Sequence, residues 1–515
     1  MEIEIRNKNL NDFQKQLVLN VSFYALLILL LVWRTLTVLN VTTVYFDSDQ
    51  PFMWLGAHDF AKGIFMEPRF YGQDYNTFIE GLIAVPLLWC RVPVYYALPI
   101  STQILFLFPI LFSAFYLFFQ QRKQNAIILL ALFNCLPLAF DIMTGLPRGL
   151  ITGLFFTSFY VINVIHPNKE RVFVLNTVLS VIGYFINPNL IIVAVPFYFF
   201  MFLNHYQSIR FYLIVLVCAT LYFPLDWMFN GFYLRHPTYV VYGLEYAVSP
   251  MYFWKTFSRP NEIFTHLNFF IEGNCYILFT VYTSLMIVLY RKHKKSFYTS
   301  LLFIPFLLAT FCMSKTWDGT TWPFYSFSRM YIGIPFVMFL LTAVIPFKKI
   351  MFSAFLTFVC FVFFGFKTTH LQKDVEHSVD KTRWGFVHLM KRPNAIEAIT
   401  FYKNVCDQYQ VKHLFVSTGF FLNTFISYGG PAIYPDYPIT QESVSERRYW
   451  AKEATKYQII PSFIYIANDF NLDQHYQLQE FKLKRLDDYG LYLVTENTLP
   501  TSQFFKTVST IENEQ

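Results

Sequence analysis

Two carboxylates, Asp47 and Asp49, stand two residues apart directly after the first long apolar segment of the chain. A charged side chain is costly inside the hydrocarbon of a bilayer, so acidic residues at the edge of an apolar segment are candidates for function. A carboxylate there is suited to act as a general base that accepts the proton of a hydroxyl group. The alternative is a structural role, because Ser48, Asp49 and Gln50 are also suited to cap a helix that begins at Pro51.

The same segment carries other groups that suit a charged, polyhydroxylated ligand. Cationic side chains bind phosphate, whereas amides and carboxylates bind sugar hydroxyls. The candidates for substrate binding are Lys62, Arg69, Gln73, Asp74, Tyr75 and Glu80. Since Asp47, Asp49 and Glu80 are also oxygen ligands of the kind that divalent cations prefer, the sequence leaves a metal cofactor open and assigns none.

Composition indicates which elements must position these groups. Of 515 residues, 55% are hydrophobic and only 14% are charged, which indicates an integral membrane protein and excludes an ordinary soluble domain. The first apolar run, residues 17–39, is longer than the core of a signal peptide and precedes no cleavage motif, so we expect a retained first span. Further apolar runs continue to residue 367, and together they predict about eleven spanning helices of ~20 residues each.

Basic residues in short loops predict the orientation of these spans. They occur in alternate loops and so mark one face, which is expected to be cytoplasmic. They are Arg122, Lys123, Lys169, Arg171, Arg210, Arg291, Lys292, Lys294, Lys295, Lys348 and Lys349. We therefore expect a cytoplasmic amino terminus, with the 40–94 loop, the 315–329 loop and residues 368–515 on the extracytoplasmic side. The short apolar run at 81–90 is expected to be an interfacial helix.

Residues 368–515 are charged and mixed, and predict a soluble second domain. Helical text at 394–410 precedes strand-like segments near 413–418 and 459–469 and a two-strand pattern at 481–497. The predicted fold is thus a polytopic α-helical membrane domain, residues 1–367, followed by an extracytoplasmic α/β domain. The second domain contains no phosphate-loop, H-E-x-x-H or G-x-S-x-G motif, so we expect it to bind or position rather than catalyse. Cys406 is its only cysteine, and no disulfide framework is predicted.

Other loops on the predicted outer side add three candidates. Arg148, in the loop expected to begin at Asp141, is suited to bind phosphate but is equally well explained as a snorkelling arginine. His236 and Glu245 lie in the 229–265 loop, where either is placed to touch substrate. A lone histidine in an aromatic loop is more often structural.

The first loop resembles that of a known enzyme superfamily. The order of a span, an acidic doublet, a helix ending in A-K-G and then F-Y-G-Q-D-Y-N-T-F-I-E-G resembles GT-C glycosyltransferases. It is most similar to bacterial relatives of the protein mannosyltransferases and lipid A aminoarabinose transferases. The resemblance implies a GT-C-like fold in residues 1–367, a polyprenyl-phosphate-linked sugar as donor, and a catalytic carboxylate at the start of this loop. On this chain that role falls on Asp49, with Asp47 second.

A second part of the resemblance lies at 326–331. The text S-F-S-R-M-Y resembles the Arg-Tyr pair of the family and implies Arg329 and Tyr331 as ligands of the donor, although Met330 separates the two. Gln50 also replaces the second residue of the usual Asp-Glu dipeptide. Metal use varies within the superfamily, since oligosaccharyltransferase members use a metal ion and the closer relatives do not.

The expected activity is therefore that of a membrane glycosyltransferase in a bacterial inner or plasma membrane. It would transfer a sugar to a lipid, glycan or protein acceptor by one inverting displacement, with membrane lipids and no nucleic acid as partners. A lipid-linked oligosaccharide flippase or polymerase is the first alternative. Such a protein would be expected to place charge within its spans, whereas the spans predicted for this chain are nearly free of charge. A secondary transporter is the second, and it would show paired helix breaks, of which Asn187-Pro188-Asn189 is one.

Overall fold

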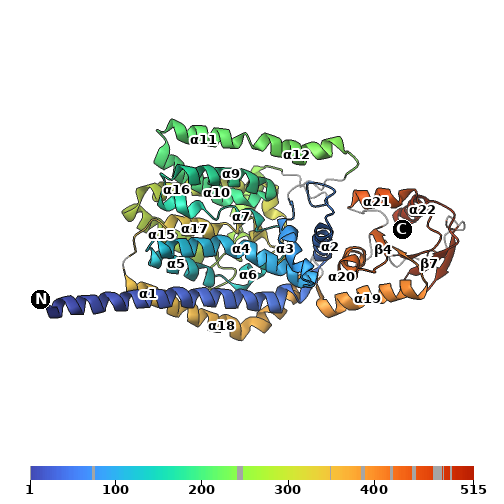
Figure 1. The fold of residues 1–515 in the computed structure, drawn as a ribbon, viewed down its shortest axis with the longest axis horizontal. Helices are drawn as coiled ribbons and strands as arrows, with labels where there is room; N and C mark the ends of the chain where they lie inside the picture. Colours follow the sequence, from blue (N-terminus) through green and yellow to red (C-terminus); the bar gives the residue numbers. More distant parts are fainter. Residues whose placement is uncertain are drawn as a thin grey trace. The chain divides into compact units, whose positions relative to one another are not determined.

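The computed structural model describes residues 2–71, 76–239, 247–347, 349–383, 389–417, 422–442, 448–467, 472, 478, 481–487 and 490–514, without the side chains of 2–12, 380–383 and 511–514. The described chain is mostly helical and forms two compact units (Figure 1). We call Met1–Thr42, Pro99–Trp227 and Leu244–Val387 the helical unit. We call Thr43–Leu98, Met228–Gly243 and His388–Gln515 the mixed unit.

Long apolar helices form most of the helical unit. Five helices of the described chain are long and apolar enough to cross a membrane, or six if the bent pair α5 (Lys123–Asn134) and α6 (Leu138–Gly145) is one span. The five are Phe13–Thr42, Val94–Phe119, Pro188–His205, Ile209–Arg235 and Ile350–Val379. The chain therefore has the helices of a membrane protein.

The predicted number of about eleven spans is not confirmed. Where one span was expected at 125–141, α5 and α6 meet at 90°. Pro137 precedes α6, and a proline disfavours helical backbone in the residue before it, which accounts for the break. The run expected at 148–166 is divided into the short helices α7 (Thr152–Phe155) and α8 (Tyr160–Ile165).

Three further apolar helices lie at the lower length limit of about 17 residues for a span. They are α9 (Glu170–Ile186) and α16 (Lys294–Thr310), with 17 residues each, and α15 (Cys275–Lys292), with 18. The remaining helices of this unit are α1 (Glu2–Thr37), α4 (Val94–Phe119), α10 (Ile191–His205), α11 (Ile209–Ala219), α12 (Tyr222–Arg235), α13 (Pro250–Phe257), α14 (Pro260–Ile263), α17 (Ile334–Thr342) and α18 (Ile350–Arg383). Single turns are η1 (Val38–Thr42), η2 (Pro188–Leu190), η3 (Ser314–Trp317), η4 (Pro323–Tyr325) and η5 (Phe327–Tyr331). Helix α1 packs against α5 and α18, and α10 packs against α16 and α17.

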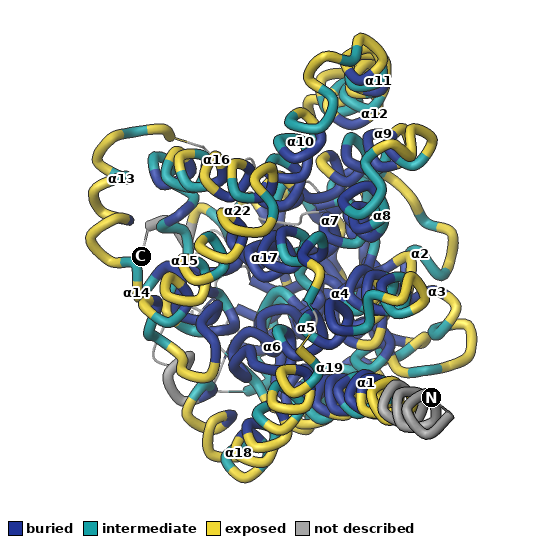
Figure 2. Tube along the Cα trace, turned by 90° about the vertical axis from the view of Figure 1, so that its left-hand side faces the viewer, coloured by how far each residue is buried: buried dark blue, intermediate teal, exposed yellow. Residues whose placement is uncertain are grey.

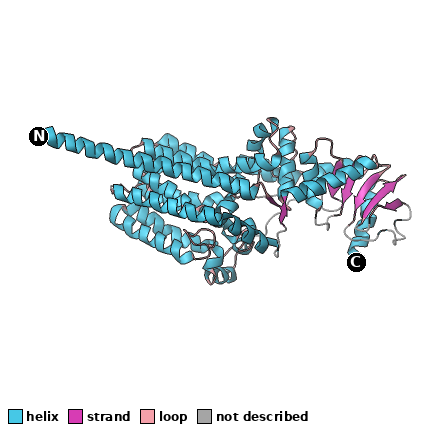
Figure 3. Ribbon diagram, turned by 90° about the horizontal axis from the view of Figure 1, so that it is seen from below, coloured by secondary structure: helices cyan, strands magenta, loops and turns pink. Residues whose placement is uncertain are grey.

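The mixed unit is built on a β-sheet, drawn in magenta in Figure 3. The sheet has five strands in the order β4-β3-β5-β7-β6. Strand β3 (His413–Val416) is parallel to β4 (Ile439–Glu442) and β5 (Phe463–Ile466). Strand β7 (Leu491–Thr495) is antiparallel to β5 and to β6 (Lys482–Arg485). The predicted α/β domain is confirmed, including the helix α19 (Arg392–Gln408) and the two strands around a turn.

Alternating strand residues bury both faces of this sheet. Leu414 and Val416 lie in a core with Ile399 of α19, whereas Phe415 lies in a second core with Phe504 and Phe505 of α22 (Thr501–Glu514). This period of two is the pattern of a strand that is covered on both sides. The other elements of the unit are α2 (Gln50–Ala61), α3 (Ile79–Trp89), α20 (Gly430–Ile433), α21 (Tyr449–Lys456), η6 (Phe425–Gly429), β1 (Tyr45–Asp47) and β2 (Leu389–Lys391).

The first loop shares its hydrophobic core with the C-terminal sheet. Phe52 of α2 packs on Tyr428 of η6, with ring centroids 4.9 Å apart, and both lie in the core that contains Leu414. Residues 43–98 therefore fold with 388–515 in one compact unit, and the predicted boundary at 367/368 falls inside α18. Helix α3 has 11 residues, about 16 Å, which is too short to cross a ~30 Å hydrocarbon layer.

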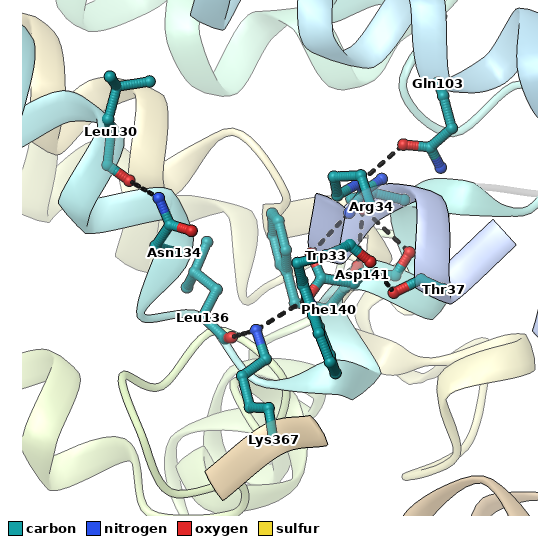
Figure 4. A network of polar contacts seen from close by, with 11 residues as sticks. Trp33, Arg34, Thr37, Gln103, Leu130, Asn134, Leu136, Phe140, Asp141 and Lys367 are labelled. Atoms are coloured by element: carbon teal, nitrogen blue, oxygen red, sulfur yellow. Dashed lines mark hydrogen bonds and ion pairs between the residues drawn. The ribbon is translucent and has the colours of Figure 1, made fainter. Parts of the chain in front are cut away.

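The apolar helices are not free of charge, contrary to the expectation from their composition. Asp141, expected in an outer loop, is buried in α6 and forms ion pairs with Arg34 of α1 (2.6 Å) and Lys367 of α18 (3.3 Å) (Figure 4). Trp33 Nε1 donates to the same carboxylate at 2.6 Å, and Arg34 Nε donates to Gln103 Oε1 of α4 at 2.7 Å. The buried carboxylate thus links α1, α6 and α18, and Arg34 extends the network to α4.

Replacing this carboxylate should destabilise the helical unit. Asp141→Asn leaves Arg34 and Lys367 buried without their counter-charge, and removing one partner of a buried ion pair costs about 3–5 kcal/mol. We expect a clearly lower unfolding temperature of the purified protein in detergent. Arg210→Gln is the matched control, because the Arg210–Glu170 pair is exposed and 3.8 Å long and should contribute little. Equal unfolding temperatures for Asp141→Asn and the wild type would show that the cluster is dispensable.

Candidate functional site

The two aspartates of the acidic pair have different surroundings. Asp47 is the last residue of β1 and is fully buried, and its Oδ1 accepts the backbone amides of Asp49 (3.0 Å) and Gln50 (3.3 Å). Asp49 is the N-cap residue of α2 and is half-buried, and its side chain forms no bond to the amides of that helix. Asp47, and not Asp49, therefore satisfies the amide groups at the start of α2.

The strand that carries Asp47 is held by the C-terminal part of the chain. Strand β1 pairs antiparallel with β2, so that Asp47 lies opposite Leu389. The backbone amide of Arg392 donates to Val44 O at 2.8 Å, and its Nη1 donates to Thr43 O at 3.2 Å and to the Tyr96 hydroxyl at 2.6 Å. Arg392 thus fixes the chain on both sides of the acidic strand.

A second carboxylate of the loop, Asp59, was not identified from the sequence. It lies near the end of α2, is buried, and accepts a hydrogen bond from the Tyr71 hydroxyl. Burial, followed by the charge of Asp59, raises the pKa of Tyr71 well above its usual range. The phenol of Tyr71 therefore stays protonated and donates a hydrogen bond to Asp59. No spacing in the sequence distinguishes Asp59 from a residue on a solvated helix face.

The cationic and acidic groups between α2 and α3 pack against residues 228–235, the part of α12 that belongs to the mixed unit. The Arg69 guanidinium lies 5.0 Å from the ring centroid of Phe229 and donates to Asn230 Oδ1 at 3.4 Å. The Tyr233 hydroxyl donates to Glu67 Oε2 at 2.9 Å. Arg69 is buried by these contacts. A substrate that bound to its guanidinium would therefore have to share it with Phe229 and Asn230.

The other predicted residues of this unit are not brought into one cluster. Lys62 is exposed after the end of α2, and Glu80 is fully buried in the first turn of α3. His236 is exposed, with its ring stacked 4.3 Å from Phe232 and its Nδ1 2.9 Å from Phe232 O, which are contacts of a structural histidine. The predictions for Gln73, Asp74, Tyr75 and Glu245 lie outside the described residues.

A cationic cluster in the helical unit contains the predicted Arg329. Its buried guanidinium donates from Nη2 to Asp318 Oδ2 at 2.8 Å and from Nη1 to Ser326 O at 3.0 Å. The Tyr325 hydroxyl donates to Asp318 Oδ1 at 2.6 Å, and Lys315 forms an ion pair with the same carboxylate. A Cβ atom on residue 319, at φ +154°, would lie 2.4 Å from Arg329 Nη1, so this loop requires Gly319.

Three cationic side chains of the described chain, Arg148, Lys315 and Arg329, gather at Tyr325 and Asp318. The guanidinium of Arg148 lies 5.9 Å from the Tyr325 ring centroid, and that of Arg329 lies 4.3 Å from it. Burial alone would raise the pKa of Asp318, but the charge of Arg329 and the hydrogen bonds from Lys315 and Tyr325 outweigh burial and lower it. Asp318 is therefore ionised at neutral pH and pairs with both Arg329 and Lys315. Sequence reasoning identified Arg148 and Arg329 but missed Lys315, Asp318 and Tyr325.

Tyr331 lies apart from these polar groups. It is fully buried, its hydroxyl is 3.1 Å from Thr310 Oγ1, and its ring packs 5.2 Å from that of Phe264. The expectation that Arg329 and Asp49 act on one substrate concerns residues of different units and stays a prediction. Among the described residues, which include Asp47, Asp49 and Glu80, no group of three or more His, Cys, Asp or Glu side chains is placed to hold a metal ion.

The different contacts of the two aspartates predict different effects on α2. Asp47→Ala removes an acceptor of two amides, and since losing a helix cap costs ~1 kcal/mol, deuterium exchange at the start of α2 should accelerate about fivefold. Mass spectrometry of the peptide that contains residues 49–53 measures this exchange. Asp49→Ala is the matched control and should leave it nearly unchanged. A larger effect of Asp49→Ala would assign the capping role to Asp49.

Comparison with known proteins gives no relative for this chain. No protein-family model matches the sequence, no curated protein matches it, and no solved structure matches its fold.

Proposed function

We propose that the chain is a membrane glycosyltransferase that moves a sugar from a polyprenyl-phosphate donor to an extracytoplasmic lipid, glycan or protein acceptor. The observation that carries the proposal is that Asp47 and Asp49 differ in their contacts with the start of α2. Asp47 bonds to the α2 amides, whereas the Asp49 carboxylate, half-buried beside it, has no part in capping. A carboxylate held at a fixed helix start is suited to act as a base.

The reaction requires one base and a cationic group. Asp49 takes the proton of the acceptor hydroxyl as its oxygen attacks the anomeric carbon, and the bond from that carbon to the lipid phosphate breaks in the same step. A new carbon–oxygen bond forms on the opposite face of the sugar, so the configuration inverts. Cations stabilise the negative charge that develops on the leaving phosphate.

The cationic cluster around Tyr325 supports the assignment of the donor phosphate to the helical unit. Arg148, Lys315 and Arg329 lie around Tyr325 and Asp318, and all three belong to the unit that carries the apolar helices. A polyprenyl chain requires an apolar surface close to its phosphate. Arg329 is held rigidly by Asp318 and Ser326, and a prepositioned guanidinium loses little freedom when it binds phosphate.

The proposed topology follows from the basic loops. We propose about eleven crossings, which requires two or three spans beyond the five or six long apolar helices and α9, α15 and α16. The amino terminus then lies in the cytoplasm of a bacterium, and residues 388–515 lie outside its inner or plasma membrane. In intact cells, or in spheroplasts if an outer membrane is present, a carboxyl-terminal tag should be accessible to antibody and an amino-terminal tag should not. An inaccessible carboxyl terminus would place the acidic pair on the cytoplasmic side and contradict the donor assignment.

A flippase or polymerase of lipid-linked oligosaccharides is the second candidate. The buried cluster of Arg34, Asp141 and Lys367 favours it, because charges inside membrane helices commonly mark a pathway for polar or charged groups. The two candidates differ in their dependence on Asp49. Translocation of a lipid-linked sugar requires no base, whereas glycosyl transfer does.

The decisive variant is Asp49→Asn. The amide keeps the size of the side chain but accepts no proton, so transfer of labelled sugar from polyprenyl phosphate to membrane acceptors should fall ~10²–10⁴-fold, the usual loss for a general base. Asp47→Asn should be milder, because an amide oxygen still accepts the α2 amides. A folded Asp49→Asn protein with wild-type transfer would refute the assignment.

The outcome for Asp47→Asn separates the remaining readings. If that variant were the inactive one, the two aspartates would exchange roles and the enzyme proposal would hold. If the wild type moved lipid-linked sugars across vesicle membranes and both variants kept that activity, the flippase would replace the glycosyltransferase.

A further inference from the structure

Helix α13 exposes an apolar stripe on the surface of the helical unit. Met251, Trp254 and Phe257 are 65%, 66% and 54% exposed, and their spacing of three residues places them along one side of the helix. Thr256, on the opposite side, is buried. In Figure 2 the tube of α13 lies at the margin of the molecule and is largely exposed. A contiguous stripe of this kind on a protein surface marks an interaction site.

The helix is fixed where α16 ends. Helix α16 ends at Thr310, and the Ser249 amide donates to Cys312 O at 2.8 Å. On the buried side of α13, Thr256 Oγ1 lies 3.1 Å from Thr316 Oγ1 and accepts from Trp317 Nε1 at 2.8 Å. These bonds hold α13 at the level where an apolar helix of the bundle gives way to a polar loop. In a membrane protein this is the level of the lipid headgroups.

Two cations flank the stripe. Lys255 Nζ lies 4.4 Å from the ring centroid of Trp317, and the guanidinium of Arg259 lies 5.7 Å from it. Both side chains are exposed, and Arg259 forms an exposed ion pair of 3.8 Å with Glu262. The attraction between each cation and the face of the Trp317 ring orients the side chain. This contact does not use the N–H groups of the cation, which can therefore donate to phosphate oxygens. Among the residues that the structure describes around α13, Lys255 and Arg259 outnumber Glu262 and form a cationic edge beside the apolar stripe.

We infer that α13 docks on the membrane surface and binds an anionic phospholipid. Met251, Trp254 and Phe257 enter the boundary between headgroups and acyl chains, where tryptophan is preferred, and Lys255 and Arg259 bind the headgroup phosphate. A helix with an apolar face and a cationic edge, placed at headgroup level, complements a negatively charged lipid surface better than it complements a protein. The inference does not depend on the catalytic role of Asp49.

Quenching by brominated lipids tests the docking of α13. The full-length protein is placed in nanodiscs of phosphatidylcholine with one quarter phosphatidylglycerol, and either lipid is brominated in its acyl chains. The chain has nine tryptophans, so the contribution of Trp254 is the difference between the wild type and Trp254→Phe. Quenching that is stronger in the wild type than in Trp254→Phe supports insertion of the stripe. An equal quenched fraction in both proteins would overturn it.

The two cations are tested with the same readout. In the double variant Lys255→Gln/Arg259→Gln, the excess of Trp254 quenching by brominated phosphatidylglycerol over phosphatidylcholine should be lost, since each charge near an anionic surface changes lipid preference roughly fivefold. Lys169→Gln/Arg171→Gln removes two exposed cations elsewhere in the unit and should keep the excess. Equal quenching by the two lipids in the wild type, or an unchanged excess in the Lys255/Arg259 variant, would overturn the headgroup assignment. An unfolding temperature equal to that of the wild type shows that the variant is folded.

Discussion

The helical unit depends on one buried carboxylate and the charges that surround it. Asp141 faces two cations, Arg34 and Lys367, and an indole donor, all within a bundle of apolar helices. An ion removed from water is tolerated only when opposite charges and hydrogen bonds replace its hydration. The three helices that supply these groups, α1, α6 and α18, must therefore keep their relative rotation and depth, because a shift of any one of them separates a buried charge from its partner.

This constraint extends to the cationic loop. Helix α6 carries Asp141 and also packs against η4, which contains Tyr325. Close approach at the end of α6 requires Gly145, since a Cβ atom there would lie 2.8 Å from Gln103 Nε2 and 3.2 Å from Thr42 Cγ2. The position of the Arg329 and Tyr325 cluster is thus connected through α6 to the buried ion pairs. The ion pairs of Asp141 and the polar contacts of Tyr325 are therefore connected through the packing of α6 on η4.

The mixed unit gives residues 388–515 a definite structural role. They supply strand β2, Arg392 and the hydrophobic face on which α2 packs, and all three hold the segment that carries Asp47 and Asp49. The C-terminal sheet is therefore part of the scaffold of the acidic pair and not an appended module. This arrangement agrees with the absence of nucleotide-binding and hydrolase motifs from that part of the sequence.

The sequence by itself determined those features that depend on neighbours along the chain. Hydropathy identified a membrane protein, and short apolar, strand-like runs such as LFV and LYLVT, together with the helical segment that precedes them, identified the α/β domain. The acidic pair was identified because Asp47 and Asp49 follow directly after the first long apolar segment. The number of spans was not confirmed, since hydropathy windows do not register the 90° bend before α6 or the division of 148–166.

Only the tertiary structure decided what each charged group contacts. Arg34 and Asp141 are 107 residues apart and Lys367 and Asp141 are 226 apart, so no local pattern reveals that these charges neutralise one another inside the bundle. The same holds for Tyr71 with Asp59 and for Asp318 with Arg329, whose partners are chosen by the packing of separate elements. The capping role of Asp47 also depends on the pairing of β1 with β2, in which Asp47 lies opposite Leu389, 342 residues away. Charge, hydropathy and turn preference depend on residues that are neighbours in the sequence. Ion pairs and side-chain hydrogen bonds depend instead on which surfaces meet when the chain folds.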